Sequence, residues 1–448
     1  MIEKSKCLAL FGGEKIVQDH SSLRIKWPIV SEEDKEAVIK SFDDYDFSGR
    51  GSEEVYLLEK EMANFFGMPY ATALNSGTAA LHAALVSLDI NEDDEVIVPN
   101  LTFIATALAV VHNKSIPVFA DVDPYTYNIT ADNIEAVITP KTKAVVIVHM
   151  HGIPADMDPI IDICKKYHLY MIEDVAQAPG ATYKGKLVGS FGDASTFSLM
   201  SQKNLATCGE CGMLLNKTIV QKNKAEMLRI YGEVIKSNET RVYNSITFGW
   251  NYTLNPIQAS MARTQLRSFT SLTNRIRIAG EFLNKTLSKF DWLTPPYNNE
   301  DFRSVFHFYR IMLDPTRIGY ADRGRFRMAV QHALNAEGLN VRHYQTVPVS
   351  EQPVFKNKIR GLNLPPKENF PCTLHIIRSS LIIGAIGSTP SYLLCDGTSQ
   401  LYFRGIEKIN NNMDLLLSYA SSLDYREPWE DVPVISDSFG AEYINASI

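Results

Sequence analysis

Short apolar segments alternate with longer amphipathic segments through the first half of the chain. The short segments predict strands at Tyr70–Leu74, Glu95–Pro99, Pro117–Asp121, Lys143–His149, Leu169–Glu173, Ala194–Leu199 and Met213–Leu215. The longer segments predict helices at Val55–Phe66, Ala79–Leu88, Thr102–His112, Ile134–Ile138, Asp156–Tyr167 and Ile219–Tyr231. This alternation is typical of an α/β fold, in which helices cover both faces of a mostly parallel sheet.

The second half of the chain predicts a smaller α+β unit. Two helices, Ile257–Phe269 and Ser271–Leu287, lead into it. Its own predicted strands and helices are Val305–Leu313, Arg323–Glu337, Asn340–Tyr344 and Tyr402–Leu423. These patterns divide the chain into an N-terminal arm at 1–30, a large domain at 31–270, a smaller C-terminal domain at 271–423 and an acidic tail at 424–448.

Charge and hydropathy argue against two classes of binding partner, nucleic acid and membrane. The formal net charge of −7 argues against nucleic acid, which requires a basic surface. No apolar run is long enough to cross a bilayer, and the first residues lack the apolar core of a signal peptide. We therefore expect no membrane partner and a cytoplasmic location.

The six cysteines are scattered and form no disulfide framework. Cys208 and Cys211 form a CxxC motif, but a zinc site needs a second pair of ligands at matching spacing, and none is apparent. We therefore expect no metal. A redox dithiol stays open, although two small residues packed in a glycine-rich turn are the simpler interpretation.

A carboxylate and a lysine follow two consecutive predicted strands. Asp174 ends the first strand, and Lys203 lies in a short turn just past the second. Chemistry with pyridoxal 5'-phosphate (PLP) needs this pair, because a carboxylate keeps the pyridine nitrogen protonated and a lysine holds the cofactor as a Schiff base. The alternative is an aspartate that caps a loop and a lysine on the surface.

A possible phosphate site precedes an alanine-rich helix. In Asn75-Ser76-Gly77-Thr78, glycine allows close approach, and hydroxyls add donors to the free N–H groups of the helix start. A simple helix cap explains the same residues. This turn, Phe103, Asp174 and Lys203 all fall at carboxyl ends of predicted strands, where α/β sheets bind their ligands.

Taken in order, several motifs resemble those of the DegT/DnrJ/EryC1/StrS family of PLP-dependent sugar and aminocyclitol aminotransferases, from about Leu8 to Leu423. The matching motifs are Asn75-Ser-Gly-Thr-Ala-Ala-Leu81, Val98-Pro-Asn-Leu-Thr-Phe-Ile-Ala-Thr106, Pro117-Val-Phe-Ala-Asp-Val-Asp123, His151-Gly-Ile-Pro-Ala-Asp-Met157, Ile172-Glu-Asp-Val-Ala-Gln177, Val188-Gly-Ser-Phe-Gly-Asp-Ala194, Gly249-Trp-Asn-Tyr252 and His343-Tyr344. The resemblance implies the aspartate aminotransferase fold.

The resemblance also implies a role for each matching residue. Lys203 should carry the cofactor and act as the base, and Asp174 should pair with the pyridine nitrogen. The other implied cofactor contacts are Gln177 at the phenolic oxygen, Phe103 stacked on the ring, and Gly77, Thr78 and Ser198 at the phosphate. Asn251 should reach the phosphate from a second subunit, which implies a homodimer with sites at the interface.

The resemblance implies a transaminase that moves an amino group from glutamate or glutamine to a nucleotide-linked deoxy-sugar ketone or a cyclitol ketone, by a ping-pong mechanism. Three departures from the family pattern, at Pro179, Cys211 and Thr253, affect the substrate assignment more than the cofactor assignment. Two alternatives remain. One is a PLP-dependent sugar dehydratase, whose relatives carry histidine in place of Lys203. The other is a catalytically silent relative that serves as a partner subunit.

Overall fold

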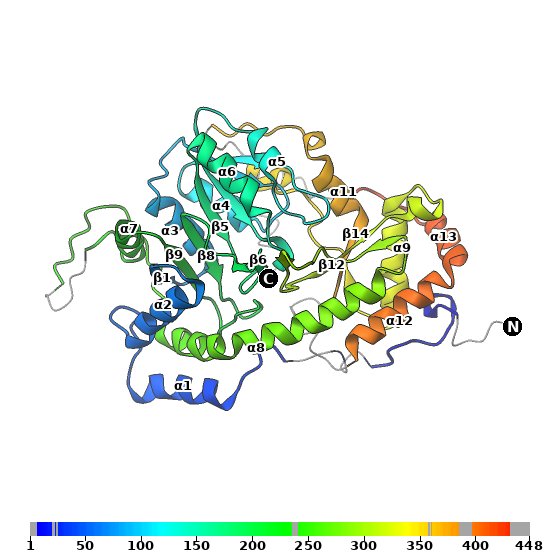
Figure 1. Cartoon of the computed structure of the whole chain (residues 1–448), viewed down its shortest axis with the longest axis horizontal. Helices are drawn as coiled ribbons and strands as arrows, with labels where there is room; N and C mark the ends of the chain where they lie inside the picture. Colours follow the sequence, from blue (N-terminus) through cyan, green and yellow to red (C-terminus); the bar gives the residue numbers. More distant parts are fainter. Residues whose placement is uncertain are drawn as a thin grey trace, which may run out of the picture.

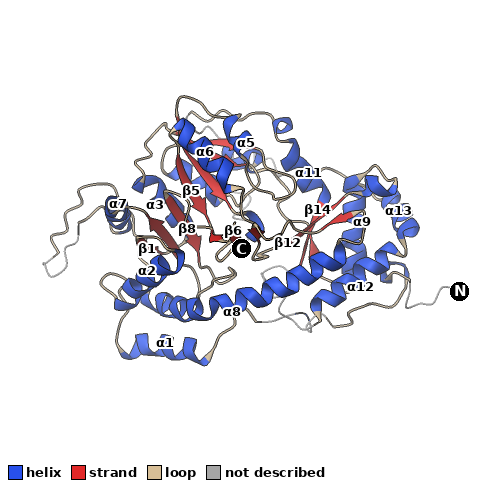
Figure 2. Cartoon of the chain, in the orientation of Figure 1, coloured by secondary structure: helices blue, strands red, loops and turns tan. Residues whose placement is uncertain are grey.

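The computed structural model describes residues 7–430 except 20–22, 24–25, 235–240, 357–358, 360 and 385–396. Most of the predicted tail, from residue 431 onward, lies outside the described residues. Within them, a large α/β body occupies the left of Figure 1 and a smaller body the right, joined along one long helix. Figure 2 shows the strands of both bodies inside layers of helix. The predicted α/β class with a smaller α+β unit is confirmed.

The large body is built on a sheet of seven strands. In spatial order these are β1 (Tyr70–Leu74), β9 (Gly212–Asn216), β8 (Ala194–Ser198), β5 (Tyr170–Asp174), β4 (Thr142–Val148), β2 (Glu95–Pro99) and β3 (Ile116–Ala120). β9 runs antiparallel to both of its neighbours, and the other neighbouring pairs are parallel. The carboxyl ends of β4, β5 and β8 therefore meet at one edge of the sheet.

Helices pack on both faces of this sheet (Figure 1). They are α2 (Glu53–Phe66), α3 (Gly77–Ser87), α4 (Ala105–His112), α5 (Ala131–Glu135), α6 (Met157–Tyr167), α7 (Ile219–Arg229) and α8 (Pro256–Leu287), and α1 (Glu32–Asp43) packs against α8 rather than against the sheet. Polar side chains cap the first turns of α1 and α2. The Ser31 side chain accepts a hydrogen bond from the Asp34 N–H, and the Asp34 carboxylate accepts one from the Ser31 N–H; Ser52 caps α2. Gly67 ends α2 with a φ of 68°, as a left-handed cap requires.

The smaller body has a sheet in the order β10 (Leu293–Thr294), β12 (Tyr309–Leu313), β14 (Ser380–Ile383) and β13 (Val341–Arg342). Its helices are α9 (Arg323–Ala336), α10 (Pro353–Lys356), α11 (Pro371–Ser379), α12 (Thr398–Asn410) and α13 (Met413–Ser422). A third, small sheet consists of β11 (Phe302–Arg303), β6 (Thr182–Tyr183) and β7 (Lys186–Leu187). The prediction of one final helix at Tyr402–Leu423 was wrong, because α12 and α13 are separated at residues 411–412.

Helix α8 joins the two bodies. Its first half buries Ala262, Leu266 and Phe269 in the core under the large sheet, and its second half buries Leu283 and Leu287 in the core of the smaller body. The prediction of two helices here was wrong, since α8 runs unbroken across the predicted domain boundary at residue 270. The division of the chain into domains stays a prediction.

Candidate active site

A cavity of about 390 Å³ opens at the carboxyl ends of the parallel strands. Seven of the eight residues singled out from the sequence line it: Gly77, Thr78, Phe103, Asp174, Gln177, Ser198 and Lys203. They come from the start of α3, the loop before α4, the ends of β5 and β8, and the turn after β8. Asn251 is not among the lining residues; it is exposed in the loop that precedes α8.

One end of the cavity is the N-terminus of α3. Ser76 caps this helix, because its hydroxyl accepts the Ala79 N–H at 3.1 Å. A Cβ atom on Gly77 would lie only 2.7 Å from the Cβ of Ser198, so glycine is required for α3 to approach the end of β8 this closely. Free N–H groups and hydroxyls at a helix N-terminus form a site for a phosphate.

The Asp174 carboxylate is buried at the end of β5. It accepts hydrogen bonds from Thr106 Oγ1 at 3.2 Å and from the Ala176 N–H at 3.1 Å. Burial raises the pKa of Asp174, although the Ala176 N–H and the Lys203 charge counteract it. No ion pair of Asp174 occurs among the described residues. Since a buried carboxylate is costly without a positive partner, this one suits a cationic group placed in the cavity.

Glu173, the neighbour of Asp174 in β5, has a different environment. Its carboxylate accepts the N–H groups of Gly189, Phe191 and Gly192 at 2.6–2.7 Å and lies 3.1 Å from the His149 ring. Burial acts to raise the pKa of Glu173, but these hydrogen bonds hold it below its usual value. Successive side chains on a strand face opposite ways, so Glu173 anchors the loop after β7 while Asp174 faces the cavity.

The Lys203 side chain reaches the cavity from a tight turn. Burial lowers the pKa of Lys203, and the charges of Asp174 and Glu210 offset part of this effect. A lowered pKa increases the fraction of neutral amine at a given pH, and the neutral amine is the nucleophile that attacks an aldehyde. The site therefore combines a buried carboxylate with an activated amine.

Gln177 and Phe103 complete the group found from the sequence. The Gln177 side-chain oxygen accepts the N–H of His151 at 2.8 Å, which orients its NH₂ group. Phe103 precedes α4 and is 59% exposed, although it lines the cavity. An aromatic ring with one open face suits stacking against a flat ring in the cavity.

The cavity is also lined by side chains that were not singled out as site residues, among them Met200, Glu210, His307, Phe308 and Arg342. His307 and Phe308 directly precede β12, and Arg342 lies on β13 of the smaller body. The Arg342 guanidinium carbon lies 5.1 Å from the Phe308 ring centre and 5.3 Å from the ring of Tyr344, which also lines the cavity. No pattern along the chain shows that the smaller body docks here.

Residues at the departures from the family pattern do not line the cavity. Gly180 follows Pro179 and has a φ of 85°, and its carbonyl accepts Arg277 Nη2 at 2.6 Å. Cys211 is buried beside Glu210, and Thr253 lies beyond Asn251. Among the described residues, no group of three or more His, Cys, Asp or Glu side chains could hold a metal. Over the same residues, no helix is both long and apolar enough to span a bilayer.

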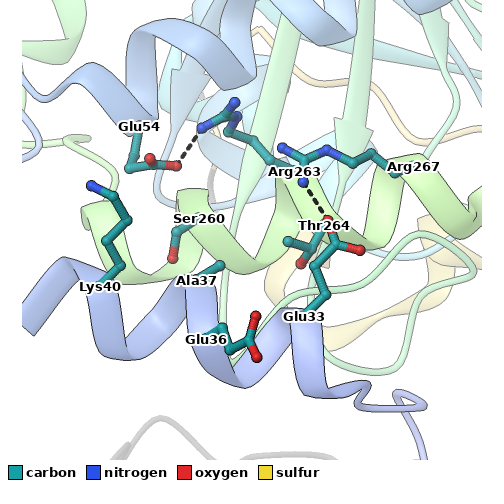
Figure 3. A pocket seen from close by; sticks show the side chains of 9 residues that line it. All are labelled: Glu33, Glu36, Ala37, Lys40, Glu54, Ser260, Arg263, Thr264 and Arg267. Atoms are coloured by element: carbon teal, nitrogen blue, oxygen red, sulfur yellow. Dashed lines mark hydrogen bonds and ion pairs between the residues drawn. The ribbon is translucent and has the colours of Figure 1, made fainter.

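A second hollow of about 300 Å³ lies between α1 and α8 (Figure 3). Arg263 is within 2.6 Å of Glu54 and 2.8 Å of Glu61, and Arg267 pairs with Glu33. Because both guanidinium groups already have carboxylate partners, they offer little to an anionic ligand. These pairs instead hold the surface of α8 against α1 and α2.

Comparison with known proteins identifies the family. Residues 28–378 match the sequence model of the DegT/DnrJ/EryC1/StrS aminotransferase family. The chain belongs to this family. Its members are PLP-dependent, so the protein is a PLP-dependent transaminase and stands among the sugar aminotransferases.

Individual relatives support this assignment. The chain is 41% identical over 256 residues to a GDP-perosamine synthase from Caulobacter vibrioides, covering 57% of this chain and 68% of that protein. It is 37% identical over 301 residues to a UDP-N-acetyl-3-dehydro-alpha-D-glucosamine 3-aminotransferase from Acidithiobacillus ferrooxidans, covering 67% and 77%. The solved structure of an aminotransferase from Psychrobacter cryohalolentis aligns with a TM-score of 0.78 at 28% identity, covering 87% of this chain and 99% of that one.

The cavity of this aminotransferase fits PLP at three points. The N-terminus of α3 offers N–H groups to a phosphate, the buried Asp174 carboxylate suits a protonated pyridine nitrogen, and Lys203 offers an amine to the aldehyde. These three features line one cavity.

The close approach of Gly77 to Ser198 leads to a prediction for cofactor affinity. In the Gly77→Ala variant the new methyl group should push Ser198 away from the phosphate, at a cost of about 1–3 kcal/mol. We expect the Kd for PLP, measured by absorbance titration of the cofactor-free protein, to rise about tenfold or more.

Gly67→Ala is the matched control. Its Cβ would meet no atom within 4 Å, but its φ of 68° is unfavourable for alanine. The control should lose about 1 kcal/mol of stability and keep the wild-type Kd. Equal PLP affinity in Gly77→Ala and wild type would show that the phosphate lies elsewhere.

Proposed function

We propose that the enzyme transfers an amino group from glutamate or glutamine to the keto group of a nucleotide-linked deoxy-sugar or of a cyclitol ketone, by a ping-pong cycle. The observation that carries the proposal is the meeting of Asp174, Lys203 and the N-terminus of α3 in one cavity. The names of the relatives, which include a GDP-sugar and a UDP-sugar enzyme, support a nucleotide-linked acceptor.

When bound, PLP supplies an aldehyde that takes up the amino group and a ring that accepts the electron pair released with the donor's Cα proton. Over the full cycle the donor becomes a 2-oxo acid and the ketone becomes an amine. The amino group and one hydrogen pass to the acceptor carbon, and oxygen returns to the donor carbon by way of water. The exchange therefore needs no outside oxidant or reductant.

Lys203 and Asp174 have separate roles in catalysis. In the proposal, Lys203 Nζ would hold the cofactor at its aldehyde carbon, and as the free amine it would take up and return the proton that leaves the donor Cα. Asp174 would keep a proton on the ring nitrogen, because its carboxylate is buried and forms no ion pair among the described residues.

The remaining lining residues would hold the reactants in place. The NH₂ group of Gln177, oriented by the His151 N–H, is proposed to donate to the phenolic oxygen, and Phe103 to cover one face of the ring. On the side of the smaller body, Arg342 lies over two aromatic rings. A fixed guanidinium there supports anionic substrates, whether the carboxylate of the donor or the diphosphate of the acceptor.

The test is a substrate screen with the protein loaded with the amine form of the cofactor. Nucleotide-linked keto-sugars and cyclitol ketones are added one at a time, and conversion to the aldehyde form is followed by absorbance. We expect one class to be converted, with one donor molecule consumed per amine formed when glutamate or glutamine is present. Consumption of the sugar without loss of donor would instead show a dehydratase.

The proposal includes a homodimer in which Asn251 serves the partner's cavity. Antiparallel pairing of Ile230 with Asn251 and of Glu233 with Ser245 starts an extension that projects beside α7 at the left of Figure 1. Its exposed apolar side chains include Val242 at 81%, Tyr243 at 74% and Phe248 at 94%. Apolar surface this exposed favours burial against another chain, and a second copy would bring Asn251 to a new cavity.

Mixing two inactive variants tests this arrangement. Lys203→Ala and Asn251→Asp should each be defective, the latter because a carboxylate repels the phosphate. In a mixed dimer, one cavity would combine an intact Lys203 with an intact Asn251 from the other subunit. We expect the 1:1 mixture, after subunit exchange, to show several-fold more activity than the two variants measured apart. No gain in a mixture proven to contain mixed dimers would show that Asn251 does not serve the partner's cavity.

A further inference from the structure

The N-terminal arm contacts the backbone of Lys203. The indole Nε1–H of Trp27 donates to the Lys203 carbonyl oxygen at 3.1 Å, and the Lys203 N–H donates to the Met200 carbonyl at 2.8 Å. The N–H and the carbonyl group of the Lys203 backbone therefore both form hydrogen bonds. The indole bond comes from a residue 176 positions away in the chain.

The next residue ties the same turn to the smaller body. Asn204 is buried. Its side-chain NH₂ group donates a hydrogen bond to the Val305 carbonyl at 3.1 Å, and its side-chain oxygen accepts one from His307 Nδ1 at 2.6 Å. Val305 and His307 lie just before β12. The Lys203 turn is thus held from one side by the arm and from the other by the start of the smaller sheet.

The arm itself is anchored before Trp27. Leu8 and Val17 are buried in the core of the smaller body, and the carboxylate of Glu337 accepts the N–H groups of Ala9 and Ile16. The Trp27 side chain is half-buried and packs against the same core.

The chain is also anchored after Trp27. The Ile29 carbonyl accepts Gln265 Nε2 from α8 at 2.9 Å, and Asp34 accepts the same nitrogen at 2.9 Å. An indole fixed on both sides in this way can restrain the group to which it donates.

We propose that Trp27 is a positioning residue for Lys203: its indole N–H fixes the lysine backbone so that Nζ reaches the reacting carbons. The inference rests on the proposed role of Lys203. A misplacement of about 1 Å in a reacting group costs about 100-fold in rate, so loss of the indole bond, which is one of the contacts that hold the turn, lowers turnover measurably. Through the bond from Trp27, the position of the Lys203 turn also depends on the anchored N-terminal arm.

The test replaces the indole N–H and keeps the ring. Trp27→Phe removes the donor, and 3-benzothienylalanine at position 27 replaces the N–H by sulfur with almost no change of shape. We expect kcat to fall about tenfold in both variants, with KM for donor and acceptor changed less than twofold. In the cofactor-free protein, backbone amides of residues 199–211 should exchange hydrogen about tenfold faster than in wild type.

Trp292 provides the matched control, because its Nε1–H donates to Asn410 Oδ1 at 3.0 Å within the smaller body. Benzothienylalanine at position 292 should lower stability without changing kcat or exchange at 199–211. The inference is overturned if the sulfur analogue at position 27 matches wild type in both readouts, since packing alone would then explain Trp27. Hydrogen exchange needs no cofactor, so it decides the inference even if wild type fails to bind PLP covalently, which would refute the proposed function instead.

Discussion

Lys203→Ala is expected to abolish transamination while the fold persists. The variant loses both the amine that holds the cofactor and the base that moves the proton, so turnover should fall by about 10⁴-fold or more, the upper end of what one acid–base group supplies. Borohydride treatment of the PLP-loaded protein, followed by mass spectrometry of the peptide around position 203, should show covalent cofactor in wild type and none in the variant.

Lys184→Ala is the matched control for this experiment. Lys184 is an exposed lysine that pairs with Asp158 at 2.6 Å, outside the cavity. Its loss should change neither the borohydride product nor turnover. Substantial residual turnover in Lys203→Ala, with correct folding shown by circular dichroism, would contradict the assignment of Lys203. A silent partner subunit would show no turnover even in wild type.

The fold of the large body could be predicted from the sequence because its elements are local. The predicted β1 and β2 match the structure at both ends, since apolar runs flanked by polar turns define a buried strand without knowledge of its neighbours. Helix α8 was divided in two because the polar residues at 270–271 resemble a break. They are instead surface positions of a helix whose two ends are buried in different cores.

Among the residues that line the cavity, those that follow strands of the large sheet could be found from the sequence, and those contributed by the smaller body could not. Asp174 and Lys203 follow strands, and parallel strands bring their carboxyl ends together, so the pattern alone places them at one edge. His307 and Arg342 reach the cavity only because the smaller body docks against that edge. Trp27 reaches Lys203 across most of the large body's sequence. Contacts between bodies leave no periodic signal along the chain.

Asp174→Asn is expected to slow transamination without preventing covalent attachment of the cofactor. Removing one partner of a buried charge pair costs about 3–5 kcal/mol, and each 1.36 kcal/mol of barrier is tenfold in rate. The rate of the half-reaction with the donor should therefore fall at least about 100-fold. Stopped-flow absorbance measures this rate, and borohydride should still attach the cofactor to Lys203, which separates the role of the carboxylate from that of the amine.

Glu173→Gln is the matched control for Asp174→Asn, because it removes the adjacent carboxylate of the same strand. Glu173 accepts backbone N–H groups of the loop at 189–192 and lies beside His149, on the face of β5 away from the cavity. Its replacement should lower the melting temperature but leave the half-reaction rate per folded molecule near that of wild type. Equal loss of rate in both variants would mean that the charge of Asp174 acts through the stability of β5. A loss confined to Asp174→Asn would show that this carboxylate acts on the cofactor's ring nitrogen.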